Sequence, residues 1–152
     1  MALHYRRANE LMLIIAASQT TPAHVLEQLS SEDDPQLLEH VAENPTTPVI
    51  TLGYLAGHSN ADVRIAVTHN PMVPADILCA LTNDESVDVR FAIASNPLLP
   101  VTVIHEICAD ENPYVAARAW QTLHRILNEH ANESPISLAL RNIRYERIDQ
   151  AS

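Results

Sequence analysis

Apolar residues recur along this chain at spacings of three and four, in short runs that return with a 26-residue period. Spacings of three and four mark one face of an α-helix. The recurring positions form four columns when the chain is aligned on its period: Leu26, Leu52, Leu78 and Ile104; Leu29, Leu55, Leu81 and Ile107; Leu37, Val63, Val89 and Val115; Val41, Val67, Ile93 and Ala119. The pattern predicts two short helices per repeat, whose apolar faces are covered only when neighbouring repeats stack.

A five-residue frame separates the repeats. It reads Asn-Pro-x-x-Pro and begins at Asn44, Asn70 and Asn96. Proline disfavours a helical conformation of the residue before it, so each asparagine ends a helix, and the second proline suits the first turn of the next one. We expect the first helix of each repeat to begin at that proline, with Thr21 and Thr47 as its N-caps in the first two repeats. The asparagines are expected to be buried amides that hydrogen-bond to turn backbone.

The second helix of each repeat should begin after a capping side chain, at Asp34, Asn60, Ser86 and Asn112. The four repeats then span 22–47, 48–73, 74–99 and 100–125. We expect one domain over 1–152, in which 1–21 is an N-terminal half-repeat cap and 126–152 a C-terminal helical cap.

The fourth repeat lacks the Asn-Pro pair, because Thr122 and Leu123 stand in its place. The sequence therefore predicts one long helix from about Pro113 to His130. A final helix should open at Ser134-Pro135 and carry Arg141, Arg144 and Arg147.

The repeating unit, Asn-Pro-x-x-Pro-x-x-x-Leu-x-x-Leu followed by Asp-Val-Arg, resembles the leucine-rich repeat variant family, a relative of HEAT-like helical repeats. The resemblance covers residues 22–121. It implies an all-α, right-handed superhelical solenoid of 26-residue two-helix repeats, in which α-helices alternate with short α or 3₁₀ helices. Some members hold an iron–sulfur centre on an N-terminal cysteine cluster, but here no cysteine precedes Cys79, so no cofactor is expected.

The body of the chain is acidic. The whole sequence carries a net charge of −10, and residues 22–111 hold 14 carboxylates against only Arg64 and Arg90. An acidic surface repels nucleic-acid phosphates and anionic lipid, so the expected partner is another protein of neutral or basic character, with no nucleic acid and no membrane. The sequence leaves the oligomeric state open.

Two features bear on the compartment. Cys79 and Cys108 are too few for a disulfide framework and fall on neighbouring helices about 8–10 Å apart, which favours two reduced thiols in a cytoplasmic protein. Arg6 and Arg7 precede the apolar run 11–17, as in a secretion signal. That run aligns with the repeat pattern one period later, which favours a half-repeat instead.

The candidate partner surface consists of apolar and aromatic side chains beside two arginines. Ile65 and Phe91 follow Arg64 and Arg90 and should point outward, near Tyr54 and Trp120. The alternative is that this face folds against the next repeat. The arginines could receive an anionic group, but a ladder in which each one satisfies a neighbouring aspartate or helix end is the favoured interpretation.

Catalytic and metal sites are not indicated. The eight histidines share no helical face, and with two glycines the chain has no phosphate-binding loop and no nucleophile elbow. We therefore expect a non-enzymatic interaction scaffold or adaptor with an acidic solenoid surface. The alternative is a HEAT-like enzyme or maturation chaperone with a ligand groove, similar to bilin lyases. Nucleic-acid binding, as in alkylpurine DNA glycosylases, ranks lower because it needs a basic groove.

Overall fold

The computed structural model describes residues 2–131, and over this range the chain forms α-helices and no strand. The predicted all-α class is therefore confirmed. The chain divides into two compact units, Met1–Val73 and Pro74–Ser152, and the division falls inside the frame that begins at Asn70. The predicted final helix after Ser134 lies outside the described residues.

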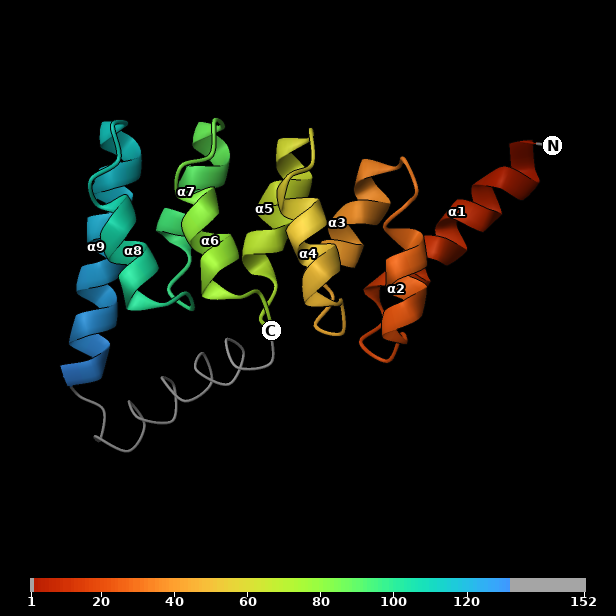
Figure 1. The fold of residues 1–152 in the computed structure, drawn as a ribbon, viewed down its shortest axis with the longest axis horizontal. Coiled ribbons are helices and arrows are strands. Elements are labelled where there is room, and N and C mark those ends of the chain that lie inside the picture. The colour runs from red at the N-terminus through yellow and green to blue at the C-terminus, as the bar shows by residue number, and fades with distance from the viewer. Residues whose placement is uncertain (1, 132–152) are drawn as a thin grey trace. The chain divides into compact units, whose positions relative to one another are not determined.

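The first unit holds five helices, which can be followed in Figure 1. They are α1 (Ala2–Ala17), α2 (Ala23–Leu29), α3 (Pro35–Glu43), α4 (Val49–Ala56) and α5 (Ala61–His69). Helix α3 packs against α1 on one side and α5 on the other, while α2 and α4 each contact α3. Helix α3 is thus the centre of this unit.

The described part of the second unit holds α6 (Ala75–Leu81), α7 (Val87–Ser95), α8 (Val101–Ile107) and α9 (Pro113–Ala131). Helix α9 packs against both α7 and α8, and α6 contacts the same two helices. The long helix predicted from the missing Asn-Pro pair is α9. The short helices α2, α4, α6 and α8 are α-helical, so the 3₁₀ form that the family resemblance allowed does not occur in them.

The predicted apolar columns form the cores of both units. All their members are buried except Leu29, which is half-buried. Val73 and Leu99, which take the place that a threonine holds in the first two repeats, are buried as well. Burial of these side chains is what stabilises helices of seven to nine residues, which are too short to persist alone.

The buried asparagines tie successive helices together within the first unit. The Asn44 amide nitrogen donates to Ala16 O at 2.7 Å and to Ser18 O at 2.8 Å. The Asn70 amide repeats this geometry, with Ala42 O at 2.6 Å and Asn44 O at 2.8 Å. Each asparagine also accepts from the backbone N–H two residues on. The predicted role of these two amides is confirmed.

The expected capping by Thr21 and Thr47 is wrong. Each hydroxyl turns back and donates to a carbonyl of the preceding helix, Ile15 O or Val41 O, both at 2.5 Å. The N-cap is the following proline, with φ near −60° and an extended ψ. This happens because the turn between the helices points the threonine hydroxyl at the last carbonyls of the helix that has just ended, Ile15 O and Val41 O, which also accept from the N–H of Ser18 and Asn44 at 3.2 and 3.3 Å.

Capping of the second helices follows the sequence more closely. The side chains of Asp34, Asn60 and Asn112 each accept from the N–H two residues on, at 3.1, 2.7 and 3.0 Å. Ser86 holds the same N-cap position, but its side chain makes no such bond.

Candidate functional site

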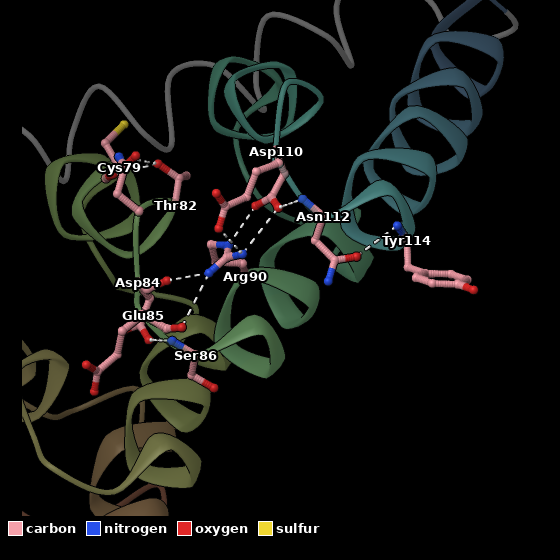
Figure 2. Close-up of polar contacts among 11 residues, drawn as sticks. Cys79, Thr82, Asp84, Glu85, Ser86, Arg90, Asp110, Asn112 and Tyr114 are labelled. Atoms are coloured by element: carbon pink, nitrogen blue, oxygen red, sulfur yellow. Dashed lines mark hydrogen bonds and ion pairs between the residues drawn. The ribbon is translucent and has the colours of Figure 1, made fainter.

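A cleft of about 540 Å³ opens in the second unit. Its walls are the turn that follows α6, the last turn of α8 with the loop after it, and one side chain from α7. The lining residues are Thr82, Asn83, Asp84, Glu85, Arg90, Glu106, Ile107, Ala109, Asp110 and Glu111. Figure 2 shows the polar contacts around Arg90 that hold these walls together.

Two equivalent turns build the cleft. Asp84 Oδ1 accepts from the backbone N–H of Ser86 at 2.8 Å, and Asp110 Oδ1 accepts from that of Asn112 at the same distance. An aspartate that bonds two residues ahead is a common way to form a tight turn. The two aspartates hold the same position in successive repeats, so the repeat places one turn beside α7 and its counterpart beside α9.

Arg90 joins these two turns from a buried position on α7. Its Nε donates to Asp110 Oδ2 at 2.7 Å and its Nη2 to Asp110 Oδ1 at 3.3 Å, while its Nη1 donates to Asp84 O at 2.7 Å (Figure 2). The hydrogen bond to Asp110 raises the pKa of Arg90, although burial opposes the shift. Arg90 is therefore a permanently charged link within the unit, with its donors directed at the protein.

Arg64 occupies the equivalent position in the first unit and is also buried. Its Nη1 donates to His58 O at 2.7 Å and to Ser59 O at 3.2 Å. The His58 and Ser59 carbonyls come six and five residues before Arg64. Asp84 and Glu85, whose carbonyls accept from Arg90, precede that arginine by the same numbers of residues. In both places the arginine fastens the loop that leads into its own helix, which supports the ladder interpretation over a receptor for anions.

The cleft is negatively charged. Its lining holds five carboxylates, from Asp84, Glu85, Glu106, Asp110 and Glu111, against the single guanidinium of Arg90. Asp110 is buried in its ion pair, whereas the Glu111 side chain is 90% exposed and lies 3.6 Å from Arg90 Nη2. Glu85 and Glu106 are exposed too. The accessible charge at the mouth is thus supplied by three glutamates.

A thiol lies beside the cleft. Burial raises the pKa of Cys79, and the neighbouring Glu106 carboxylate raises it further by charge and by a hydrogen bond. Burial also raises the pKa of Cys108, whose Sγ donates to Ile104 O at 3.3 Å. Both cysteines are free, as predicted. A raised pKa keeps more of each thiol protonated at neutral pH than in an ordinary cysteine, which lowers its nucleophilicity.

The predicted apolar surface is divided between the units. In the first unit, Tyr54 on α4 is 65% exposed and Ile65 on α5 is half-buried. In the second, Phe91 on α7 is 43% exposed and Trp120 on α9 is 56% exposed. Ile65 therefore points outward less than its helical position predicts.

Sequence reasoning missed the cleft. Along the chain the three exposed glutamates are only part of a generally acidic body, and neither Asp84 nor Asp110 is among the predicted site residues. One signal could have found these two aspartates. Asp84 and Asp110 occupy the same position in successive repeats, two residues before the capping residue of the second helix, which indicates that they form equivalent turns. Sequence reasoning also missed Ile50 on α4, the most exposed large apolar side chain among the described residues at 86%.

Among residues 2–131, no group of three or more histidine, cysteine, aspartate or glutamate side chains is placed to hold a metal ion. In the same range no helix combines the length and apolar character that a membrane crossing requires. Comparisons of the chain with protein-family models, with curated proteins and with solved structures found no match.

Proposed function

We propose that this chain is a non-enzymatic protein-binding module, and that the acidic cleft of the second unit receives a basic segment of a partner protein. The observation that carries this proposal is the charge of the cleft, which has three exposed glutamates at its mouth and an arginine whose donors are directed at the protein itself.

The scaffold we propose is a right-handed, HEAT-like solenoid of the leucine-rich repeat variant type. The first helices α2, α4, α6 and α8 begin at residues 23, 49, 75 and 101, and the second helices α3, α5, α7 and α9 at 35, 61, 87 and 113. Both series advance by one sequence repeat at each step. Proteins of such architecture present repeated surfaces for recognition, which fits a binding role.

A basic partner follows from electrostatics. Glu85, Glu106 and Glu111 lie around one cleft, where their fields add and attract cations over several ångströms. A volume of about 540 Å³ admits a few long side chains, such as those of arginine or lysine, and leaves no room for a folded domain. The segment that enters should therefore be short, and the rest of its protein should rest on the surface outside.

A peptide-display selection tests this proposal. We expect an unbiased library to yield arginine- or lysine-rich peptides whose affinity falls as ionic strength rises. The triple variant Glu85→Gln, Glu106→Gln, Glu111→Gln should bind them roughly fivefold to twentyfold more weakly, since each exposed charge pair contributes a modest amount.

The matched control neutralises three exposed carboxylates of the first unit, with the changes Glu27→Gln, Glu32→Gln and Asp33→Asn. It changes the net charge without altering the cleft and should keep nearly full affinity. Selection of neutral or acidic peptides, or an equal loss in the control variant, would contradict the proposal.

A further inference from the structure

The second unit holds an acidic cleft and, further along the same chain, a basic stretch. Three exposed glutamates, Glu85, Glu106 and Glu111, surround the mouth of the cleft, and the arginine inside it is buried in contacts with the protein. The sequence contains no lysine and nine arginines, so the chain itself can supply few cations to this cleft. The positions of these arginines narrow the choice further.

Six of the nine arginines are buried, paired on α9 or part of the first unit. They are Arg64 and Arg90, Arg118 and Arg125, and Arg6 and Arg7, in that order. The other three are Arg141, Arg144 and Arg147, which follow α9 in the second unit and lie outside the described residues. The stretch 141–147 contains one carboxylate, that of Glu146, so its charge is opposite to that of the cleft.

The length of the chain allows two of these arginines to return to the cleft. Helix α9 has 19 residues and is therefore about 28 Å long, and the cleft residue Glu111 comes two residues before its start. Arg141 follows the end of α9 by ten residues, which span at most about 36 Å, so it reaches the cleft only when this connection is almost fully extended. Arg144 and Arg147 follow by 13 and 16 residues, which span up to roughly 45 and 55 Å and leave slack.

We propose that Arg144 and Arg147 enter the acidic cleft of their own chain when no partner is bound. The segment then competes with the partner for the site. This inference rests on the proposed function, since it assigns a basic ligand to the same glutamates. The occupant is the chain's own segment because its charge complements the cleft and because a short tether holds it at an effective concentration on the order of 1 mM.

The competition is expected to be modest. Two exposed ion pairs correspond to a dissociation constant on the order of 1 mM, which is similar to the effective concentration of the tethered segment. The segment then fills the cleft about half of the time, and the apparent dissociation constant of a partner is about doubled. A partner that offers more basic residues, or contacts outside the cleft, displaces the segment, whereas a weaker basic peptide is excluded.

NMR spectra of the isotope-labelled full chain, recorded without any peptide, test the self-contact. The double variant Arg144→Gln, Arg147→Gln should shift the amides of 82–85 and 106–111 relative to the unaltered chain. Raising the ionic strength should reduce this difference, because salt screens exposed ion pairs. The spectra should be the same at about 20 µM and at about 0.5 mM, since a contact within one chain does not depend on concentration.

Two further variants serve as controls. The double variant Arg6→Gln, Arg7→Gln removes the same charge from the first unit and should leave the cleft amides unshifted. In the triple variant Glu85→Gln, Glu106→Gln, Glu111→Gln, the changes at 144 and 147 should produce little further shift, because the two sets of changes remove the same contact.

Titration with an arginine-rich peptide separates this inference from the proposed function. The double variant at 144 and 147 should bind the peptide roughly two- to fourfold more tightly than the unaltered chain. Unshifted cleft amides, or equal affinities of the two chains, would overturn the self-contact and leave the proposed function standing. Cleft shifts that fade on dilution would assign the arginines to a second copy and overturn it as well. A peptide that binds neither chain would contradict the proposed function and the self-contact together.

Discussion

Replacing Asn70 by alanine tests how the turns hold the first unit together. The side chain is 2% exposed and makes three hydrogen bonds, donating to Ala42 O and Asn44 O and accepting from Met72 N. The alanine variant removes the side-chain partner of these three backbone groups, of which Asn44 O keeps its hydrogen bond from the Thr47 N–H at 3.0 Å. Water cannot easily reach them there, so the loss should exceed that of an exposed hydrogen bond.

The expected magnitude follows from those three contacts. At about 1 kcal/mol for each net hydrogen bond, and somewhat more for buried groups left unpaired, Asn70→Ala should reduce the free energy of unfolding by about 3 to 4 kcal/mol. For a chain of this length that corresponds to a fall in melting temperature of roughly 6 to 15 °C. Asn70→Asp should be at least as severe at neutral pH, because it replaces a donor by a carboxylate facing two carbonyl oxygens.

The assay is urea denaturation followed by far-UV circular dichroism, with hydrogen exchange of the α3 and α5 amides to locate the loss. The Asn70→Asp variant should regain stability as the pH falls, because the protonated acid can donate to one carbonyl. Asn83→Ala, at an exposed asparagine, is the control and should change stability little. A loss below about 1 kcal/mol for Asn70→Ala would refute the assigned role of the buried amide.

Three further predictions concern other contacts. Arg90→Met should cost about 2 to 3 kcal/mol in urea denaturation, because it leaves the Asp110 carboxylate buried without its cation. Adding Asp110→Asn, which removes the charge and keeps the acceptor for the Asn112 N–H, should recover part of this loss, and strictly additive losses would contradict the pairing. Thr47→Val, which keeps the shape but removes the hydroxyl donor, should cost about 1 kcal/mol, and an unchanged stability would argue against its bond to the preceding helix. The raised pKa of Cys79 predicts slow alkylation in the folded chain, which Glu106→Gln should accelerate by lowering that pKa; an unchanged rate would exclude the carboxylate as a cause. The raised pKa also makes stability depend on pH, because the thiols of the unfolded chain lose their protons at lower pH than those of the folded chain. The thiols' contribution to the free energy of unfolding is therefore fully present below the ordinary thiol pKa and decreases as the pH rises above it.

Most of the helices could be predicted from the sequence because the repeat presents each local pattern several times. A single spacing of leucines is ambiguous, but four aligned examples separate the core positions from the rest. The length of α9 was predictable for a related reason, since the absence of the Asn-Pro pair at Thr122 removes a break that the pattern otherwise requires.

The direction of a side-chain hydrogen bond, the exposure of individual side chains and the position of the cleft could not be predicted in the same way. Thr47 can bond forward to the helix it precedes or back to the helix it follows, and only the turn geometry decides between them. Ile65 and Phe91 share a position in the repeat, yet Ile65 is half-buried and Phe91 is exposed. The cleft forms where two loops from successive repeats, 82–85 and 109–111, lie close together. Counting charges along the sequence does not show which loops meet in space.

The central claim is that the acidic cleft binds a basic segment, and NMR titration of the isotope-labelled chain tests it most directly. The probe is a short arginine-rich peptide, with a peptide of the same sequence carrying neutral citrulline as the control. We predict salt-sensitive shifts in the amides of 82–85 and 106–111 and in the Arg90 Nε–H, with little response to the citrulline peptide. Shifts confined to other parts of the chain, or equal responses to both peptides, would contradict the claim.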